Sequence, residues 1–291
     1  MKIAVFDNNV LPEARAQIQA LSDEPIDFPE ERCPNEEELI KRTGHADVIL
    51  VGPWDKVTAR YLDACPSVKY VCICGTSTTN VDLDELKKRN ILFTNVVDYG
   101  DEPAAEFVLM QLARLLNGVG PQQWRSERHE LRGRSVGIIG LGALGKAIAR
   151  LALAYKMDVS YFSLHRKQEW EDRGLRYADL PTLLKENEIV IVSSPTNVEV
   201  LGSEEFELLR PGSILVQASA GNVLDRQAFI GWIAHEDNYA IFDKSAGKDN
   251  YQAYKDVPRV IFADVVAGYT RETLERLYKK VLENITVYKQ G

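Results

Sequence analysis

The 291-residue sequence predicts an α/β protein with two domains, each built on a parallel sheet. Apolar, strand-like segments alternate with helical patterns along the whole chain, as parallel sheets require. Several of these segments are short unbroken runs of Val and Ile, which is typical of strands buried on both faces. The length corresponds to about two domains at ~150 residues each.

Each element follows from its local pattern. The segments predicted to be strands are Ile3–Phe6, Val48–Val51, Val68–Ile73, Val136–Ile139, Val159–Phe162, Ile189–Val192, Ile214–Val216, Ala240–Phe242 and Val260–Phe262. A strongly apolar helix is expected over Ala104–Leu116, and another over Lys146–Lys156. The last helix, about Arg271–Tyr288, places its apolar residues in one stripe, and Thr270 is its predicted N-cap.

Composition excludes several classes of protein. The formal charge of −8 argues against binding along a nucleic-acid backbone, which needs a basic surface. No apolar run approaches the ~18–20 residues of a membrane span, and the N-terminal segment does not resemble a signal peptide. The cysteines, Cys33, Cys65, Cys72 and Cys74, lack the spacing and histidine neighbours of a metal site, so we expect reduced thiols, no metal and a cytoplasmic location.

A glycine pattern predicts a dinucleotide site. Gly140, Gly142 and Gly145 form GxGxxG after a predicted strand and at the start of a predicted helix, with a second strand following. Gly140 permits the tight turn, Gly142 lets the backbone approach a pyrophosphate, and Gly145 allows close helix packing. The N–H groups at the helix start, which include those of Ala143 and Leu144, can bind phosphate. This region is therefore predicted to be a Rossmann-type domain.

The end of the second strand predicts which cofactor binds. NAD sites usually carry Asp or Glu there, which accepts hydrogen bonds from the ribose. Here Ser163 stands at that position, and His165, Arg166 and Lys167 follow. No carboxylate repels a 2′-phosphate, and a guanidinium can bind one in a forked geometry. We expect NADP(H) to be preferred over NAD(H); alternatively, Arg166 and Lys167 only form a solvated face.

Further segments together carry a family resemblance. They are 75–82 (GTSTTNVD), 94–96 (TNV), 105–106 (AE), 131–142 (LRGRSVGIIGLG), 209–217 (LRPGSILVQ), 221–225 (GNVLD) and 266–270 (VAGYT). Over nearly its whole length the chain resembles the D-isomer-specific 2-hydroxyacid dehydrogenases. The resemblance implies a flavodoxin-like substrate domain, 1–101 plus 267–291, and an inserted Rossmann domain, 102–266, which includes the interdomain helix. It also implies a homodimer and a small-molecule substrate bound between the domains.

The resemblance assigns roles to single residues. Asp243 matches an Asp that contacts the nicotinamide carboxamide, and Pro195 matches a proline beside the cofactor; Ala218 is a further candidate for cofactor contact. Ser77 and Thr78 match loop positions whose N–H groups meet the substrate, and Tyr99 is a further candidate for substrate contact.

The family's catalytic side chains are not in their expected places. The family's arginine grips the 2-oxo acid, its histidine transfers the proton, and its glutamate orients that histidine. In Gln217–Gly221 the arginine position is Ala220, and before Ala267-Gly268 the histidine position is Val265. No Glu follows Asp243, although Asp249 lies near that place.

Ala220 cannot bind a carboxylate, and Val265 cannot transfer a proton, so reduction of ordinary 2-oxo acids is expected to be very slow. One hypothesis is an NADP(H)-dependent oxidoreductase with altered chemistry, acting on an imine, an activated alkene or a non-acid carbonyl. Its candidate catalytic residues are Lys244, Lys248 and Asp264. The alternative is a non-catalytic NADP(H)-binding sensor or partner-binding protein on the same fold. An ordinary dehydrogenase whose catalytic segments are aligned differently is a third possibility.

Overall fold

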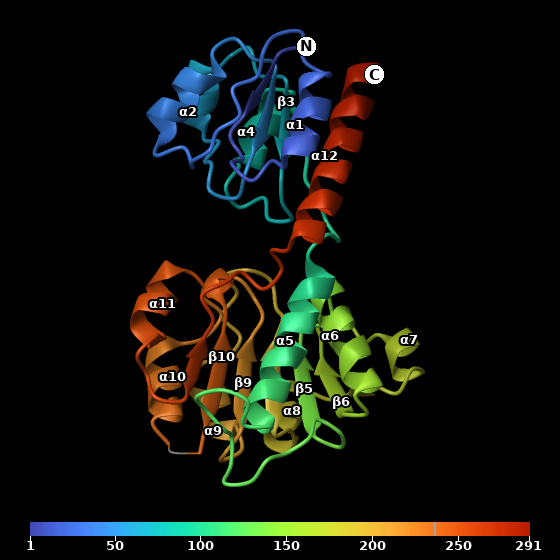
Figure 1. Ribbon diagram of the computed structural model, residues 1–291, viewed down its shortest axis with the longest axis vertical. Helices are drawn as coiled ribbons and strands as arrows, with labels where there is room; N and C mark the ends of the chain where they lie inside the picture. The colour runs from blue at the N-terminus through green and yellow to red at the C-terminus, as the bar shows by residue number, and fades with distance from the viewer. Residues whose placement is uncertain (236) are drawn as a thin grey trace. The chain divides into compact units, whose positions relative to one another are not determined.

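The computed structural model describes residues 1–235 and 237–291 (Figure 1). The chain divides into two compact units. The first is formed by residues 1–99 and 270–291, and the second by residues 100–269. These divisions lie two to three residues from the expected domain boundaries. The expected homodimer stays a prediction.

The first unit is a four-stranded parallel sheet with helices on both faces. Its strands are β1 (Ile3–Val5), β2 (Val48–Val51), β3 (Tyr70–Ile73) and β4 (Leu92–Thr94), in that order across the sheet. Its helices are α1 (Pro12–Gln19), α2 (Glu36–Thr43), α3 (Ala59–Ala64), α4 (Leu83–Lys88) and α12 (Arg271–Gln290).

Two helices from opposite ends of the chain cover one face of this sheet. α1 and α12 lie side by side (Figure 1) and bury Ile18, Leu277 and Val281 against it, whereas α2, α3 and α4 pack on the other face. Thr270 caps α12 by accepting a hydrogen bond from the Thr273 N–H (3.2 Å), as predicted.

A flavodoxin-type sheet has five strands, and here the segment after α1 forms none. Pro25 and Pro29 bracket that segment, and proline removes a backbone donor that a strand would use. Ile26 and Phe28 nevertheless pack on the core of the first unit. The segment therefore keeps its apolar contacts without joining the sheet.

The second unit is a seven-stranded parallel sheet with the order β11-β10-β9-β8-β5-β6-β7. Its strands are β5 (Ser135–Ile139), β6 (Asp158–Phe162), β7 (Arg176–Tyr177), β8 (Ile189–Val192), β9 (Ile214–Gln217), β10 (Tyr239–Phe242) and β11 (Val260–Phe262). Helices α5 (Asp101–Leu116), α6 (Ala143–Ala154) and α7 (Gln168–Glu171) pack on one face. Helices α8 (Leu180–Glu186), α9 (Ser203–Leu208), α10 (Arg226–Ile233) and α11 (Lys248–Tyr254) pack on the other, and a 3₁₀ turn spans Lys244–Ala246.

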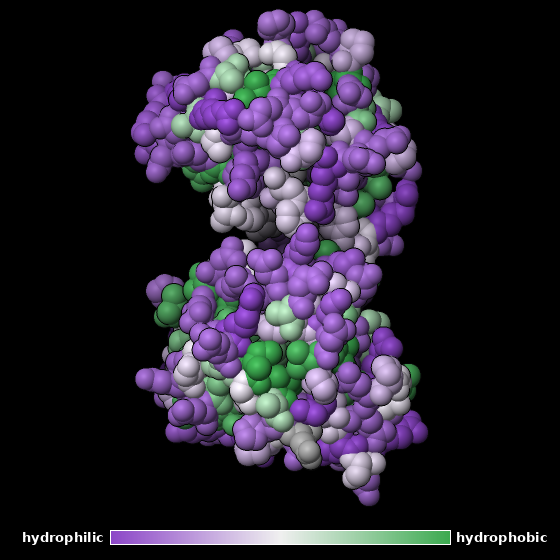
Figure 2. Space-filling model, turned by 90° about the vertical axis from the view of Figure 1, so that its left-hand side faces the viewer, coloured by the Kyte–Doolittle hydropathy of each residue, from purple (hydrophilic) through white to green (hydrophobic). Residues whose placement is uncertain are grey.

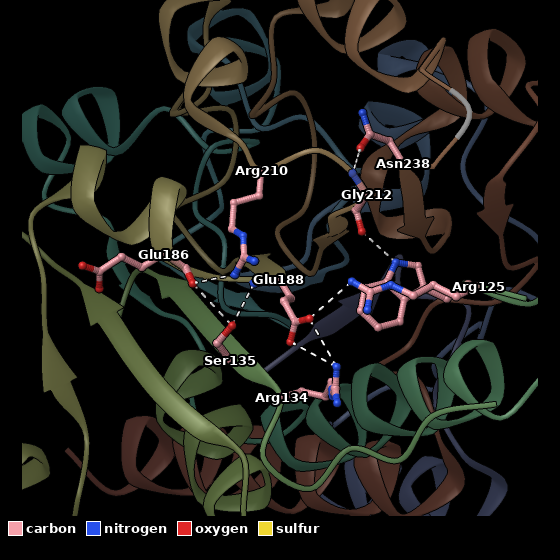
Figure 3. A network of polar contacts seen from close by, with 9 residues as sticks. Arg125, Arg134, Ser135, Glu186, Glu188, Arg210, Gly212 and Asn238 are labelled. Carbon is pink, nitrogen blue, oxygen red and sulfur yellow. Dashed lines mark hydrogen bonds and ion pairs between the residues drawn. The ribbon is translucent and has the colours of Figure 1, made fainter. Parts of the chain in front are cut away.

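The amino ends of these strands carry a polar network that fixes the connector between α5 and β5 (Figure 3). The Glu188 carboxylate accepts from Arg134 Nη1 (3.2 Å) and Arg125 Nη2 (3.4 Å). Trp124 Nε1 donates to the Gly212 carbonyl (2.8 Å). The network ties the polar connector to the strands that follow it.

The predicted strands are all present, with bounds that differ by at most two residues. β4 and β7 were not predicted, because β4 is a short edge strand with Leu92 and Phe93 exposed and β7 has two residues. Cys72 and Cys74 lie in the same core cluster of the first unit, as their alternation predicts, and all four thiols are free.

Hydrophilic residues predominate on the face drawn in Figure 2, consistent with a chain that is 27% charged. Within the described part of the chain, no helix is both long enough and apolar enough to cross a lipid bilayer.

Candidate functional site

The glycine-rich loop lies where the strand order of the second unit reverses, between β5 and β8. Ligands of open α/β sheets bind outside the carboxyl ends of the strands at such a point. Gly140 has φ +94°, which favours glycine, and a Cβ there would lie 2.6 Å from the Ser193 carbonyl oxygen. Ser193, after β8, donates from Oγ to the Gly140 carbonyl (2.6 Å) and holds the turn.

The residues after this turn fit a dinucleotide phosphate. α6 begins with no side-chain cap and no acidic residue in its first turn, so its first N–H groups remain for a ligand. A Cβ on Gly142 would meet no atom within 4 Å, which leaves room beside the backbone. A Cβ on Gly145 would lie 2.1 Å from the Gly140 carbonyl oxygen, so this glycine is required for packing. Ala143 is exposed, and Leu144 packs partly on the core.

The cationic loop after β6 is held by an unpredicted acid, Glu171 of α7. Arg166 donates from Nε (2.9 Å) and Nη2 (2.6 Å) to the Glu171 carboxylate, and it lies over the Tyr177 ring at 5.1 Å. The bond from Arg166 holds the pKa of the Glu171 carboxyl below its usual value. His165 is exposed, and Ser163 is half-buried. The predicted cations therefore lie in the loop that follows β6, and one of them, Arg166, is already paired.

The hydroxyl of Tyr161 also holds the loop after β6 in place. Tyr161 of β6 donates from its hydroxyl to Glu171 (2.9 Å) and accepts from the Lys167 N–H (2.7 Å). The sequence does place a carboxylate, Glu171, five residues after Arg166. That spacing is not one at which helices or strands bring two side chains together, so the pair was not predicted.

The turn that carries Ala220 is held by bonds around it. Gln217 donates from Nε2 to the Ser219 carbonyl (3.0 Å) and the Gly221 carbonyl (2.7 Å). Asn197, which follows β8, accepts at Oδ1 from the Asn222 N–H (3.0 Å). Pro195 is exposed nearby in the chain, and Ala218 is half-buried against the α5–α6 face. Ala220 therefore lies in a turn that hydrogen bonds hold in place, and its side chain offers only a methyl group.

Asp243, at the end of β10, is buried and bonded to two neighbouring segments. It accepts from the Ser245 N–H (3.1 Å) and from the Ala267 N–H (2.6 Å), while burial raises the pKa of its carboxyl. Through these bonds Asp243 joins the loop after β10 to the loop after β11. Alongside it, a small cavity is lined by Ala104, Phe107, Val108, Val216, Gln217, Ala218, Ile241, Asp243 and Ala267.

Two of the three candidate catalytic residues meet. Lys244 Nζ lies 2.5 Å from Asp264 Oδ1, and the Lys244 N–H donates to the Val265 carbonyl (2.8 Å). Val265 itself is 52% exposed, so its side chain does not serve the core. Lys248 begins α11 and is exposed, and no described contact joins it to this pair.

The substrate-loop candidates are gathered in the first unit, at the carboxyl end of β3. Ser77 and Thr78 lie in the loop that Gly75 begins, and the Tyr99 hydroxyl lies 3.6 Å from where a Cβ on Gly75 would stand. The Thr76 hydroxyl donates to the Val96 carbonyl (3.1 Å), which pins this loop to the segment that leads to Tyr99. Burial raises the pKa of the Tyr99 hydroxyl.

Two buried carboxylates at the same edge were not predicted. Asp7 follows β1, and Asp55 lies in the loop after β2; both side chains lie 3.4 Å from where a Cβ on Gly52 would stand. Asp55 accepts from the Gly52 N–H (2.8 Å), and Asp7 accepts from the Tyr278 hydroxyl (2.7 Å). Burial, with a smaller contribution from Asp7, raises the pKa of Asp55 to about 6. Sequence alone does not distinguish such an acid from a solvated one.

No group of three or more His, Cys, Asp and Glu side chains within residues 1–235 and 237–291 is placed to hold a metal ion.

Comparison with known proteins places the chain among dehydrogenases. Residues 108–260 match the family described as D-isomer specific 2-hydroxyacid dehydrogenase, NAD binding domain. The glyoxylate reductase of Thermococcus litoralis is 26% identical over 317 residues, covering 100% of this chain and 95% of that protein. The glyoxylate reductase of Korarchaeum cryptofilum is 28% identical over 315 residues, covering 100% and 94%.

Two solved structures share the fold over nearly the whole chain. The D-lactate dehydrogenase of Aquifex aeolicus, complexed with NAD and lactic acid, superposes with a TM-score of 0.83 at 22% identity, covering 100% of this chain and 96% of that one. An acyclic imino acid reductase, in complex with NADPH and D-Arg, superposes with a TM-score of 0.83 at 24% identity, covering 99% and 97%.

Proposed function

Because the chain belongs to the D-isomer-specific 2-hydroxyacid dehydrogenase family and carries that family's NAD-binding domain, we propose that it is an NADP(H)-dependent oxidoreductase with altered active-site chemistry. Its substrate would be an imine, an activated alkene or a carbonyl without a carboxylate. A bound NADPH supplies hydride and leaves as NADP⁺.

In this proposal the second unit holds the cofactor. The N–H groups of Ala143 and Leu144 at the start of α6 meet the pyrophosphate, and the open space beside Gly142 admits it. Asp243, Pro195 and Ala218 meet the nicotinamide end. Asp243 and Ala218 line the same small cavity, so these two residues lie close together.

The preference for NADP(H) rests on the end of β6. Ser163 replaces the usual carboxylate, and Arg166, Lys167 and His165 supply cations for a 2′-phosphate. The pairing of Arg166 with Glu171 leaves Nη1 without a described partner, so the guanidinium can still donate. Relatives of both kinds exist, since one structural relative holds NAD and another holds NADPH.

The observation that carries the altered chemistry is the pair Ala220 and Val265. Neither side chain can bind a carboxylate or transfer a proton, and Ala220 lies in a turn, 217–222, that contains no charged residue. The imino acid reductase among the structural relatives supports chemistry other than 2-oxo acid reduction on this fold. The curated relatives are named glyoxylate reductase, so glyoxylate is the sharpest substrate to test.

A second candidate function is a non-catalytic NADP(H)-binding sensor or partner-binding protein. The same absence of a family proton donor favours it, while the cofactor loop is retained. The family resemblance also implies a homodimer, which analytical ultracentrifugation would test, and the unpaired cysteines favour a cytoplasmic location.

Two measurements test the proposal. A fluorescence titration should give a lower Kd for NADPH than for NADH. Equal affinity would contradict the proposed preference for NADP(H), which rests on Arg166. NADPH oxidation should not be accelerated by glyoxylate, pyruvate or hydroxypyruvate. Brisk turnover of any of these would mean that the chain is an ordinary 2-hydroxyacid dehydrogenase whose catalytic residues lie elsewhere.

A further inference from the structure

We propose that Lys244 is the proton donor of the reaction, that Asp264 positions it, and that together they direct the site to an uncharged carbonyl. This inference rests on the proposed function, because it takes Asp243 to lie at the nicotinamide end of the cofactor. It concerns only residues of the second unit.

The geometry places the pair where a ligand of this sheet binds. Lys244 follows β10 and Asp264 follows β11, both at the carboxyl ends of neighbouring strands. The ion pair of 2.5 Å and the bond from the Lys244 N–H to the Val265 carbonyl (2.8 Å) cross between the two loops. Asp243 adds a third link to Ala267 (2.6 Å). Lys244 is thus fixed at its backbone and at its amine.

The amine remains able to act on a substrate. An ammonium has three N–H donors, and the contact with Asp264 uses one of them. The Lys244 side chain is 47% exposed, so the other donors can reach a ligand. The bond to Asp264 limits the positions that a flexible lysine can take, which reduces the ordering needed in the transition state.

The charges of the site indicate the substrate class. The loops after β9, β10 and β11 (217–222, 243–249 and 264–267) contain three aspartates and two lysines, so they carry no excess of positive charge. Ala220 adds none. A carboxylate would therefore gain no net attraction here, and a protonated imine already carries the proton that Lys244 would supply. A neutral carbonyl is the substrate that fits both conditions.

In the proposed step, the carbonyl is reduced to an alcohol. The π bond of the carbonyl breaks as its carbon receives hydride and its oxygen takes a proton from Lys244 Nζ. A C–H bond and an O–H bond form, an alcohol leaves, and solvent returns a proton to the amine. Asp264 takes no proton and keeps the lysine in place.

Methyl pyruvate and pyruvate form a matched pair of probes, since the ester has the same keto group without the charge. With NADPH, kcat/KM for methyl pyruvate should exceed that for pyruvate by roughly tenfold or more. Lys244→Met should lower kcat by about 10²–10⁴, the usual contribution of a positioned acid. Its Kd for NADPH, measured by fluorescence, should stay within about twofold, since the pair does not hold the cofactor. Lys244→Arg should not restore the rate, because a guanidinium keeps the charge but does not give up its proton.

Asp264→Asn tests positioning separately. It should raise KM little and lower kcat, because Lys244 loses the bond that limits the positions of its amine. The Asp264→Asn variant keeps the other charged side chains of these loops, Asp243, Lys248 and Asp249. Lys255→Met is the control, since Lys255 forms a surface ion pair with Asp256 (3.7 Å) at the far end of α11.

Each result has a defined meaning. Failure to bind NADPH would overturn the proposed function itself. Binding of NADPH with no turnover of methyl pyruvate, faster turnover of pyruvate, or an unchanged kcat in Lys244→Met would overturn this inference alone. A larger loss in Lys248→Met than in Lys244→Met would also overturn it.

Discussion

The two edges of the second unit's sheet use polar groups differently. At the amino ends of the strands, Glu188 is bonded to Arg125 and Arg134, and Ser135 and Arg210 bond to the Glu186 carbonyl (Figure 3). At the carboxyl ends, α6 begins without a cap beside the open space at Gly142. The first edge joins chain segments to one another, whereas the second leaves donors for a ligand. Stability and binding should therefore respond to different substitutions.

The largest effect is expected for Gly145→Val. Its Cβ would lie 2.1 Å from the Gly140 carbonyl oxygen and 2.9 Å from Ser193 Oγ, so α6 must move away from the loop. We expect a loss of more than about 3 kcal/mol in the free energy of unfolding and the loss of measurable NADPH binding. Urea unfolding and fluorescence titration measure the two effects.

Gly142→Ala is the matched control, because a Cβ there meets no atom within 4 Å. It should change the free energy of unfolding by less than about 1 kcal/mol while weakening NADPH binding. Equal destabilisation by both substitutions would contradict the distinction between a packing glycine and a binding glycine.

In the first unit, stability should depend on pH through the buried carboxyl of Asp55. Because burial raises the pKa of Asp55 to about 6, the folded state holds a proton between about pH 4 and pH 6 that the unfolded chain has already lost. Stability should fall as pH rises from about 4 to about 6, by at most about 3 kcal/mol. Asp55→Asn keeps an oxygen for the Gly52 N–H and removes the charge. The variant should therefore gain stability over the parent between pH 4 and pH 8, as urea unfolding at both pH values would measure.

A constant difference between parent and variant over that pH range would mean that Asp55 is solvated. Asp84→Asn, an exposed acid of α4, should show no such pH dependence.

The amino edge is tested by Glu188→Ala. The substitution leaves Arg134, which is 26% exposed, without its carboxylate partner. We expect a loss of about 2 kcal/mol in the free energy of unfolding and an unchanged Kd for NADPH. Weaker NADPH binding would show that the two edges are coupled, and Glu207→Ala, at an exposed position on α9, controls for removal of a carboxylate.

The smallest effect is expected at the end of β6. Arg166→Ala should weaken NADPH binding about tenfold and NADH binding little, because only NADPH carries the 2′-phosphate. Glu171→Gln should tighten NADPH binding by weakening the competing pair with Arg166. A drop of the same size for both cofactors in Arg166→Ala would assign Arg166 to the fold of the loop instead.

The sequence predicts local and periodic features well. The glycine pattern, the buried strands and the Thr270 cap all follow from residues close together in the chain. Contacts across the fold were not predictable, because no periodicity connects their partners. Ser193 holds Gly140 from a different strand, and Lys244 meets Asp264 across 20 positions of sequence. Burial of Asp55 depends in the same way on neighbours that only the folded chain supplies.

Helix α12 has a consequence for the order in which the protein forms. It completes one face of the first unit, where Tyr288 stacks on Tyr70 with 4.4 Å between ring centroids and Lys280 Nζ donates to the Val97 carbonyl (2.5 Å). A ribosome makes this helix after the whole of the second unit. During synthesis the second unit can therefore close its core first, while only α1 covers this face of β1 to β4.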